Sequence, residues 1–184
     1  MSVHPRGLCE SDQVGSGTTV SAFAHVMHGA VVGRNCAICE STFVEGGARL
    51  GDRVVVKNGV LVWDGVTIDD DVFVGPAVVF TNSLRPRAWD DVREAAPVPT
   101  RIQCGATIGA NTTIVCGTII GEYALIAAGA TLVDNVPAHA LMMGSPAHRV
   151  GWVCTCGKRL DDALRCACGL AYRQLSEDYG LQGL

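Results

Sequence analysis

An aliphatic or aromatic residue recurs at every sixth position through most of this chain, and that period restricts the fold more than any other feature. A first run has twelve members: Val14, Val20, Val26, Val32, Ile38, Val44, Leu50, Val56, Val62, Ile68, Val74 and Phe80. A second run has six: Ile102, Ile108, Ile114, Ile120, Ile126 and Leu132. Four residues after almost every member stands a small or β-branched residue, as at Thr18, Ala24 and Cys36. Each hexad therefore places two side chains inward.

This period excludes a helix and favours a β-solenoid. An α-helix repeats its apolar residues every three or four positions, and each of the chain's 22 glycines would cost about 1 kcal/mol there relative to alanine. Stacked hairpins would show turn dipeptides roughly every eight to twelve residues. Eighteen hexads, three to a coil, instead predict a parallel, all-β solenoid of about six coils over 14–150. Residues 1–13 form a lead and 151–184 an extension.

Charge and cysteine content indicate which partners and compartment to expect. A formal net charge of -4 provides no basic field for nucleic acid, so we expect a small-molecule substrate. The N-terminal segment MSVHPRGLCESDQ lacks a continuous apolar run, and the uncharged stretches are rich in Gly, Thr, Ser and Asn. Neither an export signal nor a membrane span is therefore expected. Nine cysteines without an export signal indicate a reducing compartment, so we expect a cytoplasmic protein.

The period is interrupted once, between Phe80 and Ile102. The 22 positions that separate these residues are not a multiple of six, and 81–101 contains three prolines and four arginines. Long loops inside a compact repeat are uncommon and usually functional, so we predict a protruding loop with a role in the site. Guanidinium groups bind phosphate or carboxylate. The candidates are Arg85, Arg87, Arg93 and Arg101.

Two motifs carry a resemblance to known enzymes. Hexads such as Ile108-Gly-Ala-Asn-Thr-Thr resemble those of hexapeptide-repeat transferases, and this resemblance implies a left-handed β-helix. Val79-Phe80-Thr81-Asn82 followed by Pro86-Arg87-Ala88 is similar to a loop of N-acetyltransferases that act on nucleotide-linked amino sugars. The 3-N-acetyltransferases of UDP-2-acetamido-3-amino-2,3-dideoxyglucuronate are the most similar group. Agreement extends through Lys57-Asn58, Trp63-Asp64-Gly65 and Met143-Gly144-Ser145-Pro146.

The resemblance implies an acyltransferase that moves an acyl group, expected to be acetyl, from coenzyme A to the amine of a nucleotide-linked sugar. Asn82 would hold the attacking amine through its side-chain carbonyl, and His25 would contact substrate or act as a base. Gly117 and Ala128 would let backbone amides approach acetyl-CoA. The family assembles as homotrimers that bind coenzyme A between subunits. The expected substrate-binding residues are Lys57, Asn58, Arg85 and Arg87.

Other functions remain open from the sequence. O-acetylation of a sugar or another small acceptor would require a histidine base, for which His25 is the candidate. A non-catalytic β-solenoid scaffold is the alternative outside enzymes. A zinc-dependent carbonic anhydrase of the same fold is not expected, because that site needs three histidines on adjacent coils. Only His25 and His28 lie in the main repeat.

The C-terminal extension contains a repeated cysteine motif. Cys154-Thr-Cys156-Gly and Cys166-Ala-Cys168-Gly each have the form C-x-C-G. Four thiolates so close in sequence suit a structural zinc in a cap at the end of the solenoid, with reduced thiols or disulfides as the alternatives. Cys36 is expected in the core instead. The segment 161–184 is expected to add a short helix.

Overall fold

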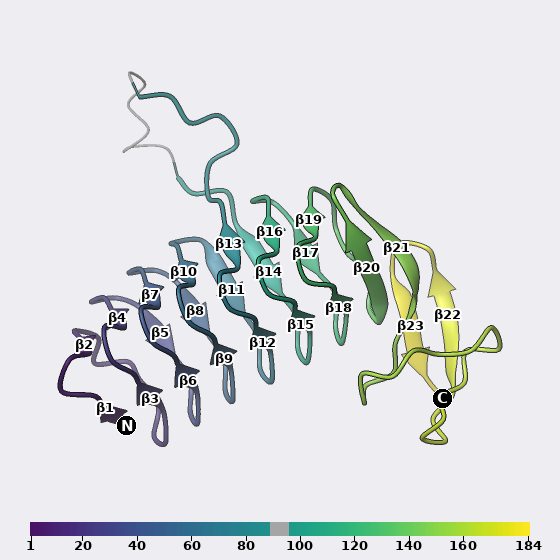
Figure 1. Ribbon diagram of the computed structural model, residues 1–184, viewed down its shortest axis with the longest axis horizontal. Coiled ribbons are helices and arrows are strands. Elements are labelled where there is room, and N and C mark those ends of the chain that lie inside the picture. The colour runs from purple at the N-terminus through teal and green to yellow at the C-terminus, as the bar shows by residue number, and fades with distance from the viewer. Residues whose placement is uncertain (89–95) are drawn as a thin grey trace.

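The chain winds as a parallel β-helix, with the N-terminus at one end of the stack and the C-terminal cap at the other (Figure 1). The computed structural model describes residues 1–88 and 96–184, which contain strands but no helix. Three sheets, here called A, B and C, form the faces of the stack. The β-solenoid predicted from the hexad period is confirmed.

Each sheet takes one strand from successive coils. Sheet A contains β1 (Ser2–Val3), β3 (Thr19–Val20), β6 (Ala37–Ile38), β9 (Val55–Val56), β12 (Phe73–Val74), β15 (Thr107–Ile108), β18 (Leu125–Ile126), β20 (Ala140–Gly144) and β21 (Ala147–Trp152). Sheet B contains β2 (Leu8–Cys9), β4 (His25–Val26), β7 (Phe43–Val44), β10 (Leu61–Val62), β13 (Val79–Phe80), β16 (Thr113–Ile114) and β19 (Thr131–Leu132). Sheet C contains β5 (Val31–Val32), β8 (Arg49–Leu50), β11 (Val66–Ile68), β14 (Thr100–Ile102) and β17 (Ile119–Ile120).

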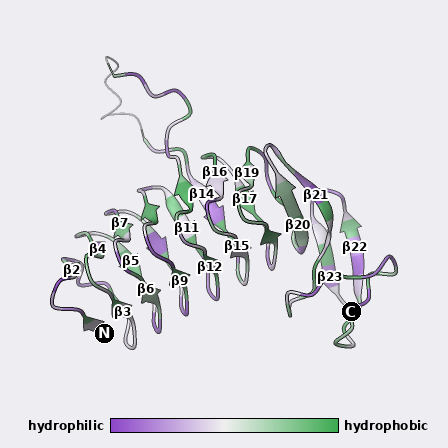
Figure 2. Cartoon of the chain, viewed as in Figure 1, coloured by the Kyte–Doolittle hydropathy of each residue, from purple (hydrophilic) through white to green (hydrophobic). Residues whose placement is uncertain are grey.

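The hexad residues form the core. From Val20 to Leu132, every member of the six-residue series is buried, and so is the residue four positions later, except after Phe80, where the insertion begins and Leu84 is exposed. Cys36 is 2% exposed, as its companion position predicts. Figure 2 shows hydrophobic residues on strands along the whole stack and hydrophilic residues in the turns between them. Aliphatic burial along the axis therefore stabilises the coils.

The register shows where the insertion enters. Thr19 pairs with Ala37, which is 18 residues later, whereas Phe73 pairs with Thr107, which is 34 residues later. The insertion therefore adds 16 residues to one coil. It leaves the stack between β13 and β14, and its described residues beyond Asn82 stand away from the coils (Figure 1). The turns are named here by the sheets that they join, so the insertion lies at the B–C corner.

Both ends of the helix contain strands that the hexad series does not include. β1 and β2 pair with β3 and β4 although they precede residue 14, and β20 continues sheet A beyond residue 137. With seven strands in sheet B, the solenoid has about seven turns rather than six. These terminal strands lack the six-residue pattern because fewer coils pack against them.

The C-terminal residues fold as strands and tight turns. β20 pairs in antiparallel fashion with β21, and β22 (Tyr172–Ser176) forms a hairpin with β23 (Gly180–Gly183). The helix expected within 161–184 was therefore a wrong prediction. Gly169, Gly180 and Gly183 disfavour a helix there, and the first two have positive φ. Residues 1–88 and 96–184 contain no helix able to span a membrane.

Candidate active site and cysteine cluster

Asn82 lies at the foot of the insertion, two residues beyond β13. Its backbone carbonyl accepts a hydrogen bond of 3.0 Å from the Val98 N–H, which joins the outgoing and returning arms of the loop. The Thr81 hydroxyl accepts a hydrogen bond of 3.0 Å from the Cys116 N–H on the next coil. The half-buried Asn82 is therefore held against the stack, while the residues after it extend outward.

Gly117 occupies the same corner one coil further along. Its N–H donates to the Pro99 carbonyl over 3.2 Å, and a Cβ added to it would lie 3.5 Å from Val98 Cγ1. Its φ of 90° favours glycine. The structure therefore brings Gly117 and Asn82 together, as two sides of one loop foot. The Gly117 amide is occupied by the loop and is therefore not free for the predicted contact with acetyl-CoA.

An aromatic row on the outer side of sheet B leads to this loop foot. Trp63 donates from Nε1 to the Phe80 carbonyl over 3.0 Å, two residues before Asn82. The Phe43 ring lies 5.8 Å from the Trp63 ring and 5.5 Å from the His25 ring. No role was predicted for Trp63, although it lies in the Trp63-Asp64-Gly65 motif. Trp63 fixes the backbone just before Asn82.

His25 stands at the other end of this row. Its Nε2 lies 3.0 Å from the Glu10 carboxylate, and this hydrogen bond to His25 lowers the Glu10 pKa. Three strand spacings along sheet B separate β4 from β13, or about 14 Å. One copy of the chain therefore does not bring His25 and Asn82 to the same substrate atom.

Lys57, Asn58 and Ala128 lie at a different corner. They follow β9 and β18, where the chain passes from sheet A to sheet B. Asn58 Nδ2 is 3.5 Å from the Glu40 carboxylate one coil below. Ala128 is exposed. The predicted residues thus flank sheet B along two separate edges of the solenoid, the A–B corner and the B–C corner.

The arginines predicted for anion binding differ in their surroundings. Arg85 and Arg87 are exposed on the protruding loop, and Arg87 donates to the adjacent Pro86 carbonyl. Arg101 pairs with Asp69 over 3.0 Å on sheet C, so its charge is already partnered. Arg93 lies outside the described residues. Arg85 and Arg87 are therefore the better placed of the described candidates to meet a phosphate.

The four C-terminal cysteines form one cluster. The sulfur atoms of Cys154, Cys156, Cys166 and Cys168 all lie within 4.8 Å of one another. The Cys154 and Cys168 sulfurs are 3.6 Å apart, as are those of Cys156 and Cys166. All nine cysteines are free thiols, so the disulfide alternative is not present in this structure.

The environment of the cluster gives its thiols different pKa values. Burial opposes the Cys154 thiolate, but the Cys156 N–H and the Tyr172 hydroxyl outweigh it and lower the Cys154 pKa to about 6. The Cys168 N–H favours a Cys166 thiolate, but burial and the neighbouring sulfurs raise the Cys166 pKa to about 12. Tyr172 donates to Cys154 Sγ over 3.1 Å. A cation would be needed to hold all four as thiolates.

Comparisons with known proteins agree with this architecture. The family model for bacterial transferase hexapeptide repeats matches residues 99–134. The dTDP-3-amino-3,6-dideoxy-alpha-D-galactopyranose 3-N-acetyltransferase of Aneurinibacillus thermoaerophilus is 42% identical over 174 residues, covering 93% of this chain and 90% of that enzyme. The bifunctional protein GlmU of Thermosynechococcus vestitus is 33% identical over 71% of this chain and 27% of its own.

One solved structure adds a bound cosubstrate. A hexapeptide-repeat acetyltransferase from Vibrio cholerae, crystallised in complex with acetyl-coenzyme A, is 28% identical with a TM-score of 0.58. The similarity covers 68% of this chain and 72% of that one.

Proposed function

Since the chain belongs to the bacterial transferase hexapeptide family, we propose that it transfers the acetyl group of acetyl-coenzyme A to the amine of a nucleotide-linked amino sugar. The identity of 42% over 93% of the chain to an enzyme of that activity carries the proposal. The alignment is long enough to include both the coil and its inserted loop. The Vibrio cholerae acetyltransferase complex supports acetyl-coenzyme A as the donor.

The loop foot suggests a mechanism based on positioning. The side-chain carbonyl of Asn82 would accept a hydrogen bond from the sugar amine and direct its lone pair at the thioester carbon. The new C–N bond forms, the C–S bond breaks, and the amine proton leaves with coenzyme A as its thiol. An amide oxygen is too weak a base to take that proton itself. Fixing the two reactants would therefore supply most of the acceleration.

The position of the histidines argues against O-acetylation. Activation of a sugar hydroxyl requires a base close to the thioester. No histidine occurs between His28 and His139, so none lies on the coil of Asn82 or on either neighbouring coil. The His25–Glu10 pair is three strand spacings away.

We propose a homotrimer in which the site is shared between copies. The predicted cosubstrate residues Gly117 and Ala128 lie on different corners, and so do Asn82 and Asn58. The described part of the loop beyond Asn82 stands away from its own coils (Figure 1). A second copy whose A–B corner faces the loop foot would place all four around one groove.

We also propose that the cysteine cluster binds zinc. Sulfur ligands about 2.3 Å from a tetrahedral zinc are about 3.8 Å from one another, close to the 3.6 Å separations here. The donor set of four thiols fits that ion. Cys154, Cys156, Cys166 and Cys168 would hold it as a structural cross-link between the two C-x-C-G turns, without a role in transfer.

Product detection by mass spectrometry tests the function directly. The full-length protein is incubated with acetyl-CoA and a panel of dTDP- and UDP-linked 3-amino and 4-amino sugars. We expect one panel member to gain a single acetyl group with release of coenzyme A. Asn82→Ala should lower kcat about 100-fold with little change in KM for acetyl-CoA, whereas Ser83→Ala on the same loop retains activity. No transfer to any amino sugar, or full activity in Asn82→Ala, contradicts the proposal.

A further inference from the structure

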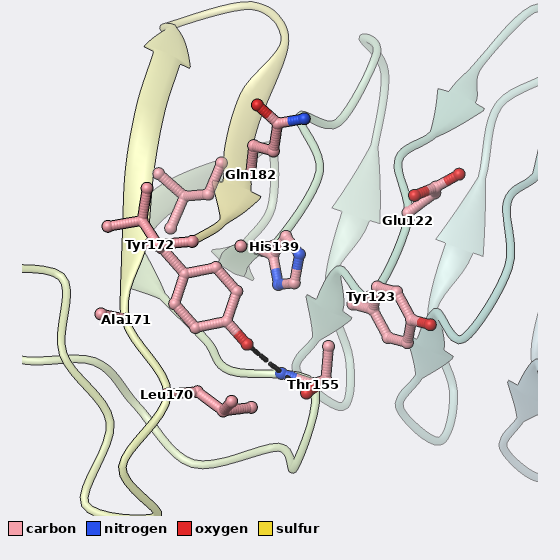
Figure 3. Close-up of a pocket in the computed structure, with 11 residues that line it drawn as sticks. Glu122, Tyr123, His139, Thr155, Leu170, Ala171, Tyr172 and Gln182 are labelled. Atoms are coloured by element: carbon pink, nitrogen blue, oxygen red, sulfur yellow. Dashed lines mark hydrogen bonds between the residues drawn. The ribbon is translucent and has the colours of Figure 1, made fainter.

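A cavity lies between the last coils and the cap, at the C–A corner rather than at the B–C corner of the loop foot. Its volume is about 290 Å³. Figure 3 shows its walls, which come from the C–A corner at Glu122 and Tyr123, from His139, and from the cap at Thr155 and Tyr172. Parts of the hairpin β22–β23 close the remaining side. This cap pocket shares no residue with the proposed transfer site.

His139 gives the cap pocket a hydrogen-bond acceptor. The side chain is 5% exposed, and its Nδ1 lies 2.9 Å from the Val153 carbonyl oxygen. A carbonyl only accepts, so Nδ1 carries the hydrogen and Nε2 of the neutral ring presents a lone pair. Burial lowers the pKa of His139, which favours this neutral form. Among the described residues, no donor reaches Nε2.

The other walls select the shape and charge of a ligand. The Tyr123 ring stacks on His139 with centroids 5.3 Å apart, and the Tyr172 ring lies 4.8 Å from it at an angle of 59°. Leu170 and Leu181 add aliphatic surface. None of the described lining residues is Lys or Arg, and Glu122 is the charged side chain among them. Aromatic faces and a carboxylate disfavour anions, so phosphate-bearing cosubstrates do not suit this pocket.

We propose that the cap pocket binds a small, flat aromatic molecule that carries an N–H or O–H donor and no negative charge. The donor would bond His139 Nε2, because a ligand without a donor would shield this nitrogen from water and leave it unpaired, at a cost in binding free energy. The ring would pack against Tyr123, Tyr172 and Leu170. Tyr172 connects this pocket to the cysteine cluster, because its hydroxyl accepts from the Thr155 N–H over 3.0 Å and donates to Cys154.

Ligand-observed NMR and calorimetry with the full chain test this inference, using indole as the probe. We expect indole to bind, with N-methylindole, which lacks the donor, about tenfold weaker and the anionic indole-3-acetate weaker than indole. In His139→Phe, indole and N-methylindole should bind equally. Leu170→Trp should fill the pocket and abolish binding, while Leu175→Trp on the exposed side of β22 should not.

The outcomes separate this site from the transferase site. No binding of indole, equal binding of indole and N-methylindole to the wild-type protein, or unchanged binding to Leu170→Trp overturns the inference. Displacement of indole by acetyl-CoA also overturns it, because the cavity would then belong to the cosubstrate. Binding that persists in the presence of acetyl-CoA supports a separate site, whatever the result of the acetyl-transfer assay.

Discussion

Two buried threonines occupy the same inward position on neighbouring coils but differ in hydrogen bonding. Thr118 donates from its hydroxyl to the Val115 carbonyl over 2.6 Å, whereas the Thr100 hydroxyl has no partner. Val66 occupies the matching position one coil before Thr100 and pairs with it in register. A valine side chain therefore fits this position in the stack.

Thr100→Val should raise the free energy of unfolding by about 1 kcal/mol, because a buried hydroxyl without a partner is replaced by a methyl group. Thr118→Val should lower it by about the same amount, since it removes a satisfied bond. Denaturant unfolding of both variants beside the wild type measures the difference. A Thr100→Val protein less stable than the wild type would show that the hydroxyl is satisfied.

Asp52, at the C–A corner, makes a pH-dependent contribution to the stability of the folded chain. Its carboxylate accepts from the Arg34 N–H over 2.7 Å and pairs with the Arg34 guanidinium over 2.9 Å, so its pKa is lowered. Because the folded pKa is below the unfolded value of 3.8, this stability is present above pH 3.8 and is lost as pH falls through the folded pKa. The unfolding midpoint of Asp52→Asn should therefore lie below that of the wild type near pH 6.

The gap between these two midpoints should close under acid conditions. Thermal unfolding of both proteins between about pH 6 and pH 2.5 measures it. Salt should narrow the gap as well, because the pair is at the surface. A gap of constant size at every pH would indicate that Asp52 acts by packing rather than by charge.

At the scale of strands and turns, sequence reasoning was most accurate where the pattern is local. The inward residues follow from the six-residue period, because each coil repeats the same alternation against the same core. Asn82 and Gly117 could be selected by resemblance, but their joint contact with 98–99 depends on how the loop returns to the stack. Contacts such as Arg101–Asp69, which are 32 residues apart, depend on the length of the insertion and carry no local signal. The wrong helix at 161–184 has a different cause, because that segment pairs locally as the β22–β23 hairpin and contains glycines with positive φ.

The two C-x-C-G turns should depend on a metal for their order. One zinc per chain is expected by elemental mass spectrometry of protein prepared with zinc, and a chelator should lower the unfolding midpoint of the cap. Cys154→Ser should lose most of the bound metal. Cys39→Ser, at a half-buried turn of the β-helix, serves as the matched control and should retain it. A wild-type protein without stoichiometric metal would leave the cluster as reduced thiols.

At the scale of the whole molecule, the separation of the predicted residues on two corners leads to a test of the shared site. Asn82→Ala and Ala128→Trp should each inactivate a homogeneous assembly, the second by blocking the exposed A–B corner. When the two variants are co-expressed, each shared site takes its loop foot from one copy and its A–B corner from the next. Each of these parts is intact in half of the copies, so about a quarter of the sites, and about a quarter of the wild-type activity, should be recovered.

Size-exclusion chromatography with light scattering should confirm that the mixed protein has the mass of three chains. The control is a mixture of separately purified homotrimers, which should stay inactive while subunits do not exchange. No recovery in the co-expressed protein would place Asn82 and Ala128 in a site formed by one copy.

The two ends of the stack are built differently. At the N-terminus, β1 and β2 each have a single parallel neighbour, so the backbone N–H and C=O groups along their other side have no partner strand in the described part of the chain. At the other end, β21 runs antiparallel to β20, and the hairpin β22–β23 joins the last coil through the bridge between Ala138 and Gly180. Filament growth requires two complementary ends on every subunit. The antiparallel cap makes this end unlike the N-terminal end, so the two ends do not match each other and head-to-tail growth into a filament is disfavoured.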